Sequence, residues 1–295
     1  MSNQTKTLLA ILGAAILGGS SGTFSKIGLR EIPPLSFAAW RFLLAAAMVF
    51  PLVKRDLLSL KKKELLKIVG VSLFSTVNIL LFVYGIRLTG AVISQTIYSL
   101  VPITVAVISY FILGEIINWQ KAVGILLGLT GATILVLWSV FNKASLVESH
   151  LGGNLLILLG AIIFSFYPVL SKKLQKDHSP LLLTAVFIMV TAVVHLGLAG
   201  IELVTHPGWW QGLSLMGVYS VFHLAVIGTV LFYLLYQHCI KYGSPVIGSM
   251  ILYVQPVTAF FWANVFLGEK ITLGFVGAAL LVLSGAYLST RTIKD

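Results

Sequence analysis

The chain has 295 residues, of which 58% are hydrophobic and 10% charged, and its mean hydropathy is +1.00. A soluble domain carries about 25% charged residues, so this composition excludes an ordinary globular enzyme and also excludes a disordered chain. The formal net charge is +11, and the single cysteine, Cys239, cannot form an internal disulfide.

Apolar runs separated by charges or by Pro and Gly predict an all-α membrane protein with ten transmembrane helices. At about 20 residues per span, ten helices use about 200 residues and leave no room for a soluble domain. The runs lack the period-two alternation of a β-barrel. In chain order, the predicted spans are Thr7–Ser25, Pro34–Val53, Leu65–Ile86, Ala91–Leu113, Ala122–Val140, Gly152–Leu170, Leu181–Gly200, Leu215–Cys239, Pro245–Leu267 and Leu273–Ser289. The first run also fits a signal peptide, but it has a counterpart later in the chain, which favours a true span.

The second span contains a basic residue, Arg41, about 10 Å from one end of the helix at 1.5 Å per residue. Polar groups inside a membrane are costly, so each one is a functional candidate. Arg41 could hold a substrate carboxylate by a bidentate pair, or it could extend to the membrane surface or pair with another helix. Asn78 in the third span and Tyr167 in the sixth are further candidates for substrate binding.

The fourth span carries Gln95, Tyr98, Pro102 and Ser109 at spacings that place all four on one helix face. The ninth span repeats this pattern with Ser249, Tyr253 and Pro256. Each proline removes a backbone hydrogen bond in mid-span and predicts a kink. Kinked helices with polar faces at matching positions indicate a substrate path, although satisfied packing faces would give the same pattern.

The eighth span places His223, Tyr233 and Gln237 on one face by the same count of 100° per residue. These side chains could line a cavity or form hydrogen bonds between helices. If protons drive transport, His223 is the best placed group to carry them, because all nine acidic residues lie in predicted loops, tails or span ends. The missing mid-membrane carboxylate also disfavours a carrier of cationic drugs.

An internal repeat divides the chain into residues 1–145 and 146–295. Pro102-Ile103-Thr104 reappears as Pro256-Val257-Thr258, and Leu113-Gly114-Glu115 as Leu267-Gly268-Glu269, both at an offset of 154 residues. Ser25-Lys26 and Ser171-Lys172 match at an offset of 146. Each half holds five spans, and because five is odd, the second half must enter the membrane inverted. The counterpart of Arg41 is Phe187, so an arginine site would be one-sided.

The basic residues predict the orientation. With both termini in the cytoplasm, inner loops and tails hold fourteen Lys and Arg and outer loops hold five. This is a clear positive-inside bias and predicts a multi-pass protein of the cell membrane. The basic charge is explained by topology and anionic lipid, so we expect no nucleic-acid partner.

The two five-span halves, the prolines Pro102 and Pro256, and the two Leu-Gly-Glu endings resemble the EamA branch of the drug/metabolite transporter superfamily. The resemblance covers nearly the whole chain. It implies a ten-helix bundle with two inverted repeats around a central cavity, which is lined by the first four helices of each half. It also implies carrier function without specifying the substrate.

These observations predict a secondary transporter that works by alternating access, most simply an exporter of amino acids or similar zwitterionic or anionic solutes. The alternatives are a drug efflux carrier of the same superfamily and a channel or non-transporting membrane module. No motif for a hydrolase, a metal site or a nucleotide-binding loop is present in the sequence, so we expect no enzyme activity, cofactor or metal. We expect the chain to function as a monomer, with the lipid bilayer and a small molecule as its partners.

Overall fold

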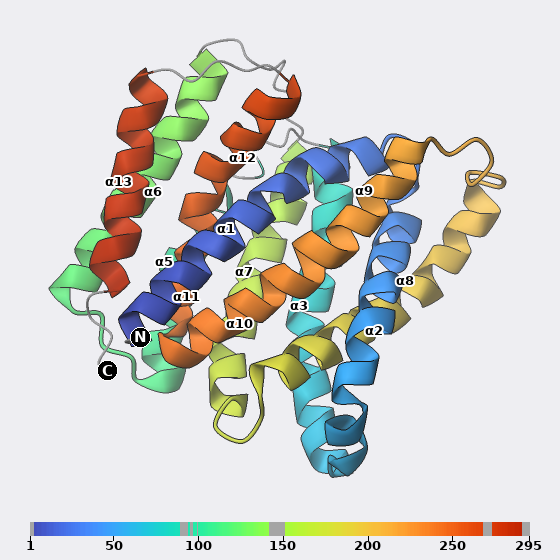
Figure 1. The fold of residues 1–295 in the computed structure, drawn as a ribbon, viewed down its shortest axis with the longest axis horizontal. Coiled ribbons are helices and arrows are strands. Elements are labelled where there is room, and N and C mark those ends of the chain that lie inside the picture. Colours follow the sequence, from blue (N-terminus) through green and yellow to red (C-terminus); the bar gives the residue numbers. More distant parts are fainter. Residues whose placement is uncertain are drawn as a thin grey trace.

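The computed structural model describes residues 3–88, 94, 97–98, 100–141, 151–267 and 273–290. Its described elements are helices, shown in Figure 1. In chain order they are α1 (Asn3–Gly28), α2 (Pro34–Ser59), α3 (Lys62–Leu88), α5 (Val101–Leu113), α6 (Trp119–Phe141), α7 (Leu151–Leu174), α8 (Pro180–Thr205), α9 (Leu215–Ala225), the π-helical segment η1 (Val226–Leu231), α10 (Phe232–Tyr242), α11 (Pro245–Ser249), α12 (Ile251–Leu267) and α13 (Leu273–Thr290).

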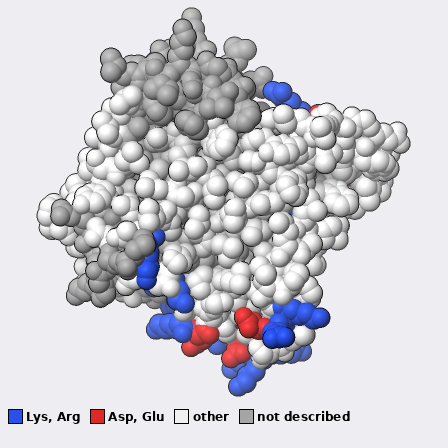
Figure 2. Space-filling model, viewed as in Figure 1, with Lys and Arg blue, Asp and Glu red and all other residues white. Residues whose placement is uncertain are grey.

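Six helical stretches in the described residues are long and apolar enough to cross a membrane, and they give the chain the character of a membrane protein. They are α1, α2, α3, α7, α8 and the continuous stretch Leu215–Tyr242. Shorter apolar helices cover Val101–Leu113, Pro245–Ala259 and Val276–Leu288. Figure 2 shows a broad band without charge across this face, with Lys and Arg gathered mainly along its lower edge. A lipid-facing belt between charged surfaces has this distribution.

Several helices begin where the sequence supplies a cap. Proline occupies the first turn of α2, α8 and α11, where its missing N–H costs nothing. The hydroxyls of Ser179, Ser214 and Ser244 accept backbone N–H groups at the starts of α8, α9 and α11. Gly114 ends α5 with a φ of 66°, a left-handed conformation that favours glycine.

A buried carboxylate caps α2. Pro33 precedes this helix and offers no side-chain acceptor, but the two oxygens of Glu202 accept the N–H groups of Leu35 at 2.9 Å and Ser36 at 2.7 Å. The sequence predicts a span that ends at Gly200, whereas α8 continues to Thr205 and buries Glu202 against α2. The negative charge stabilises the positive end of the α2 dipole and ties α2 to α8.

Helices from before residue 142 pack mainly against helices from after residue 150. The most extensive pairs are α6 with α13, α3 with α7, α2 with α8 and α1 with α12. Figure 1 shows α6 and α13 side by side at one edge of the bundle, where Gly131 and Gly285 allow close approach of their backbones. The remaining helices surround the buried core, which includes Phe42, Phe187 and Tyr236.

The predicted spans agree with the helices to within a few residues at most ends, but three spans are interrupted. The eighth contains the π-helical segment η1, and the ninth is divided into α11 and α12 around Met250. In the fourth, residues 94, 97 and 98 are helical, Leu100 lies in a turn, and α5 begins at Val101. Pro102 lies in the first turn of α5, where its missing N–H removes no hydrogen bond of that helix.

Candidate functional site

Arg41 is buried in α2 and reaches the π-helical segment η1. Its Nε donates to the hydroxyl of Thr229 at 2.7 Å, and its Nη2 donates to the carbonyl of Gly228 at 2.9 Å. In a regular α-helix the N–H of Phe232 would bond to Gly228, but here it bonds to Ile227 and Thr229 instead. The wider π-helical turn thus leaves the carbonyl of Gly228 available to Arg41.

Arg41 borders a cavity of about 110 Å³ enclosed by α1, α2, α3, α7, η1, α10 and α12. Its polar lining consists of Ser21, Ser25, Arg41, Asn78, Tyr98, Tyr233 and Gln255. Its apolar lining comes mainly from Ile79, Phe82, Phe164, Phe232 and Leu252, and glycines complete it at positions 18, 22 and 228. An apolar pocket with a few convergent polar groups is the usual form of a small-molecule site.

Arg41 supplies the charge of this cavity, since its other lining residues carry none. Among the described residues the one ion pair joins Lys121 and Glu115, so no described carboxylate neutralises Arg41. Two of its five N–H groups bind Thr229 and Gly228 along the Nε edge. The Nη1 and Nη2 end of the guanidinium is therefore available, and its parallel N–H groups fit a carboxylate or phosphate.

An amide and a phenol lie on another wall of the cavity. Asn78 of α3 donates a hydrogen bond from Nδ2 to the hydroxyl of Tyr98. The ring of Tyr98 packs edge-on against Phe82, with 5.6 Å between ring centroids. The sequence candidates Arg41, Asn78, Tyr98 and Tyr233 therefore come together around one cavity.

Tyr167 and Gln237 do not line the cavity but belong to a separate buried network. Gln237 donates from Nε2 to the hydroxyls of Tyr167 at 2.8 Å and Ser171 at 3.2 Å, and its Oε1 accepts from Gln175 at 2.6 Å. Tyr233 and Gln237 share a helix face but lie four residues, or about 6 Å, apart along the axis. One reaches the cavity and the other joins α10 to α7.

The candidates of the ninth span also lie outside the cavity lining. Ser249 donates its hydroxyl to the carbonyl of Val246 in its own helix at 2.6 Å. Tyr253 is buried toward α6, where a side chain at Gly128 would collide with its ring. Pro256 lies within α12, and its side chain, like the whole of Gln95, falls outside the described residues.

His223 lies between α9 and α1. Its Nε2 is 2.8 Å from the hydroxyl of Ser20, and its ring stacks on Phe24 with 3.8 Å between centroids. The cavity lining does not include it. The constant step of 100° per residue does not hold across η1, so His223 and Tyr233 face different neighbours.

Gln255, which lines the cavity, and Thr229, which binds Arg41, are both absent from the sequence-based site. Gln255 is an amide in an apolar span, directly before Pro256, and its polarity was a usable signal. Thr229 lies in the run Val-Ile-Gly-Thr-Val-Leu, where nothing predicts a π-helical turn. Its role depends on that turn, so it could not be found from the sequence.

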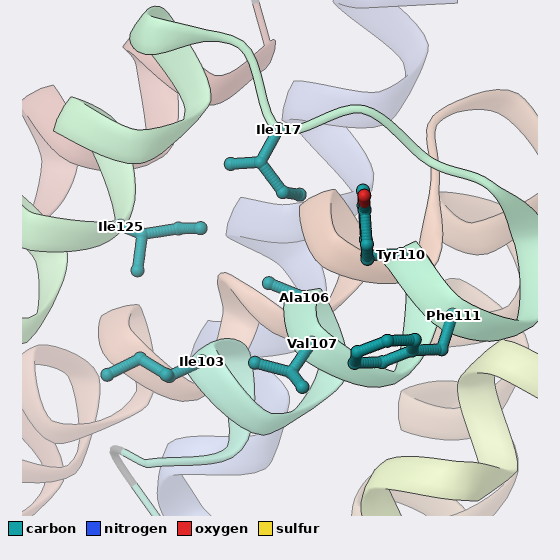
Figure 3. A pocket seen from close by; sticks show the side chains of 7 residues that line it. All are labelled: Ile103, Ala106, Val107, Tyr110, Phe111, Ile117 and Ile125. Atoms are coloured by element: carbon teal, nitrogen blue, oxygen red, sulfur yellow. The ribbon is translucent and has the colours of Figure 1, made fainter.

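A second hollow, of about 300 Å³, lies between α5 and the start of α6 (Figure 3). Its lining is Ile103, Ala106, Val107, Tyr110, Phe111, Ile117 and Ile125. Phe111 is 78% exposed and Tyr110 57%, so this hollow opens outward from the bundle. An apolar, outward-facing groove of a membrane protein suits lipid chains and offers no charged anchor for a polar solute.

The chain is similar to known transporters over nearly its whole length. The profile of the EamA-like transporter family matches residues 5–137 and again residues 151–291. The "Uncharacterized transporter YoaV" of Bacillus subtilis is 28% identical over 99% of both chains. An "Uncharacterized transporter" of Archaeoglobus fulgidus is 26% identical over 92% of this chain and 94% of that one.

A third relative carries a substrate in its name. The "S-adenosylmethionine/S-adenosylhomocysteine transporter" of Chlamydia trachomatis serovar L2 is 27% identical, and the match covers 93% of this chain and 86% of the relative. A solved crystal structure with 18% sequence identity superposes with a TM-score of 0.78 over 98% of both chains, which shows a shared fold.

Proposed function

Because the chain belongs to the EamA-like transporter family, we propose that it carries small solutes with a carboxylate or similar anionic group, such as amino acids, across the cell membrane. The observation that carries this proposal is the buried guanidinium of Arg41, which borders the cavity and has a pair of N–H donors that no described residue uses. A buried charge without a partner is costly, and an anionic substrate would supply the partner.

The rest of the cavity supports a small, partly polar solute. The amide of Asn78, the hydroxyl of Tyr98 and the amide of Gln255 can bind polar groups, while Phe82 and Phe232 offer apolar surface. The described residues that line the cavity include no acidic one, which disfavours cationic drugs as substrates. The substrates named for the Chlamydia relative both carry an amino-acid carboxylate that an arginine could bind, although S-adenosylmethionine also carries a sulfonium cation.

We also propose that residues 1–145 and 146–295 are two inverted halves, which together make ten spans. The family profile matches once within each half. In the repeat, α2 corresponds to α8 and α6 corresponds to α13, and each of these helices packs against its own counterpart. The pair α3 with α7 maps onto α1 with the α9–η1–α10 stretch, and this pair also packs extensively. Such symmetry supports alternating access, in which the two halves expose one site to each side in turn.

For the cell, we propose export by a monomer in the cell membrane with both termini in the cytoplasm. The relatives are transporters, and we assign no catalytic step to this chain. The described lining of the cavity holds no carboxylate, which favours exchange or transport down the substrate gradient over proton coupling. His223 is the coupling candidate if an imposed pH gradient alone drives uphill accumulation and His223→Gln removes it.

The test is counterflow in proteoliposomes with a panel of amino acids and organic acids, followed by variants of Arg41. We expect saturable counterflow of at least one anionic or zwitterionic solute. Arg41→Gln should raise its half-saturating concentration at least about tenfold, which is 1.4 kcal/mol, and Arg41→Lys should not restore it because a point charge lacks the planar fork. Arg30→Gln, an exposed loop arginine, is the matched control.

Two results would overturn the proposal. One is counterflow of cationic or neutral solutes alone, which would favour a drug carrier. The other is unchanged affinity for an anionic solute in a folded Arg41→Gln protein. Flux without counterflow or saturation would identify a channel instead.

A further inference from the structure

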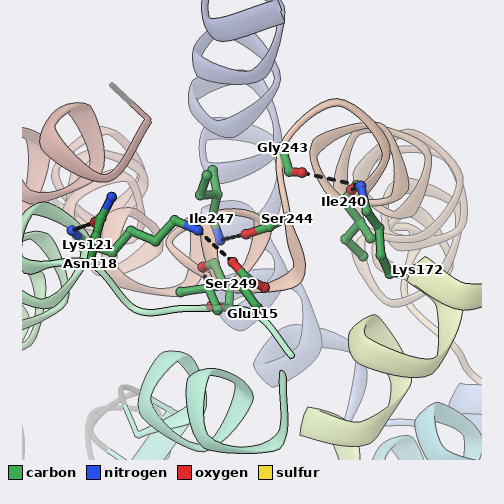
Figure 4. A network of polar contacts seen from close by, with 10 residues as sticks. Glu115, Asn118, Lys121, Lys172, Ile240, Gly243, Ser244, Ile247 and Ser249 are labelled. Carbon is green, nitrogen blue, oxygen red and sulfur yellow. Dashed lines mark hydrogen bonds and ion pairs between the residues drawn. The ribbon is translucent and has the colours of Figure 1, made fainter. Parts of the chain in front are cut away.

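Lys172, near the end of α7, binds the end of α10. Its ammonium nitrogen donates to the carbonyl of Ile240 at 2.7 Å, of Lys241 at 2.9 Å and of Gly243 at 3.3 Å (Figure 4). A lysine in this position satisfies the free carbonyls of the last helical turn and complements the negative end of the helix dipole. The contact therefore holds α7 and α10 together at the end of the bundle where α10 finishes.

The same two helices remain in contact below Lys172. Gln237 of α10 binds Tyr167 and Ser171 of α7, and the rings of Phe164 and Tyr236 stack with 5.9 Å between centroids. We call this contact between α7 and α10 the closed seam. Among these side chains Phe164 also lines the cavity beside Arg41, whereas Tyr167, Ser171, Tyr236 and Gln237 do not line it.

The internal repeat gives the closed seam a counterpart at the opposite end of the bundle, between α1 and α3. Positions on α7 map to α1 by subtraction of 146, and positions on α10 map to α3 by subtraction of 154. The counterparts of Phe164, Tyr167, Ser171 and Tyr236 are Gly18, Ser21, Ser25 and Phe82. All four of these counterparts line the substrate cavity. The contact between α1 and α3 that corresponds to the closed seam is therefore open in this structure, and the cavity occupies it.

Lys172 has a counterpart as well, and it is unused here. That counterpart is Lys26, and the carbonyls that Lys172 binds on Ile240 and Lys241 correspond to those of Ile86 and Arg87 in the last turn of α3. Lys26 is exposed and binds no described residue, and α1 and α3 do not pack extensively in the described part of the chain. Small side chains at Gly18, Ser21 and Ser25 leave room for α3 to approach α1.

We propose that Lys26 and Lys172 form alternative closing contacts at the two ends of the carrier. In the state described here Lys172 closes α7 against α10, and the cavity lies between α1 and α3. In the opposite state the ammonium of Lys26 binds the carbonyls of Ile86 and Arg87, and Lys172 releases α10. This inference rests on the proposed alternating access, and each closing contact stabilises one of the two states.

The test measures both seams in one Cys239→Ala background. Spin labels at Arg30 and Leu88 report the distance between the ends of α1 and α3, and labels at Lys176 and Tyr242 report the closed seam. Lys172→Met should shorten the first distance and lengthen the second, because it removes the closing contact of the present state. Lys26→Met should do the reverse and reduce the population with α1 near α3 at least about tenfold, the scale of charge-assisted hydrogen bonds. Lys173→Met, an exposed neighbour on the same helix, should change neither distance.

Function provides a second readout. Lys26→Met should slow counterflow while leaving substrate affinity in the present state unchanged, since Lys26 does not line the cavity. Because Lys26 is exposed, this variant keeps the proposal testable if Lys172→Met does not fold. The proposal is overturned if the wild type shows counterflow and the Lys26→Met protein matches it in rate and in both distance distributions. A wild type without any counterflow would instead overturn the proposed function.

Discussion

The Nε of Arg41 lies 2.7 Å from the hydroxyl oxygen of Thr229, so the cationic residue of α2 is held by the π-helical segment between α9 and α10. With the carbonyl of Gly228 as a second acceptor, the side edge of the guanidinium is fixed. The uncharged side chain of Thr229 therefore helps to set the direction in which the remaining N–H groups of Arg41 point.

Thr229→Val should weaken substrate binding by about tenfold, because valine keeps the shape of threonine but cannot accept the Nε–H. Thr229→Ser retains the hydroxyl and should bind as the wild type does. The measurement is the concentration dependence of counterflow, with thermal unfolding of each variant in detergent as the folding control. A Thr229→Val protein with reduced stability but wild-type affinity would limit Thr229 to a structural role.

Gly18→Ala should impair transport, because a Cβ at this position would collide with Gln255 and with the ring of Phe232 inside the cavity. The matched control is Gly197→Ala, since a methyl group at that position would have no neighbouring atom within 4 Å. In the control, alanine should stabilise its helix by up to about 1 kcal/mol. Equal counterflow rates for the two variants would show that Gly18 does not shape the site.

Glu202→Gln should destabilise the protein by about 1–3 kcal/mol, because the buried cap of α2 loses its charge and one of its two acceptors. The expected observation is a lower midpoint of thermal unfolding in detergent. Asp177→Asn replaces an exposed carboxylate that makes no hydrogen bond to a described residue, and it should leave the midpoint unchanged. Equal midpoints for Glu202→Gln and the wild type would contradict the role of Glu202 as a cap.

The hydrogen bonds of Glu31, in the loop between α1 and α2, predict that the stability of the protein depends on pH. Its carboxylate accepts hydrogen bonds from the hydroxyl of Ser214 at 2.7 Å and from the backbone N–H of Ser214 at 2.9 Å, and these bonds lower the pKa of Glu31. A carboxyl group with a lowered pKa in the folded state stabilises the protein at pH values above its pKa in the unfolded state. This stabilisation is lost as the pH falls through the pKa of the folded state. The stability difference between the wild type and Glu31→Gln should be greatest near neutral pH and disappear in acid. A difference that does not vary between pH 7 and pH 3 would rule out this linkage.

Orientation can be tested with single cysteines in a Cys239→Ala background. A cysteine at exposed Gln211, between α8 and α9, should react with an impermeant thiol reagent added outside the cell. A cysteine at exposed Lys62, at the start of α3, should react only after the membrane is opened. The reverse pattern would invert the proposed topology.

Much of the helical layout follows from the sequence because charged residues and prolines bound long apolar runs. The first three predicted spans lie inside α1, α2 and α3, and the polar residues Arg41, Asn78 and Tyr98 meet at one cavity. Helical periodicity predicts the helix face on which Gln237 lies but not its position along the bundle. The hydrogen bond from Gln237 to Tyr167 places Gln237 in the closed seam. Arg41 binds the carbonyl of Gly228 within the π-helical turn, and no local pattern predicts this contact between residues far apart in the chain.

The position of Phe187 opposite Arg41 in the repeat has an electrical consequence. Phe187 packs against Phe42 and Tyr233, so this position of the second half contributes no countercharge. The empty site then bears one positive charge, and an anion cancels it on binding. For a substrate of net charge −1, we therefore expect the return of the empty carrier, and not the loaded step, to sense the membrane potential, by up to about 2.3 kcal/mol per 100 mV for a full crossing. Net transport of such an anion should respond to voltage in proteoliposomes, while its one-for-one exchange should not.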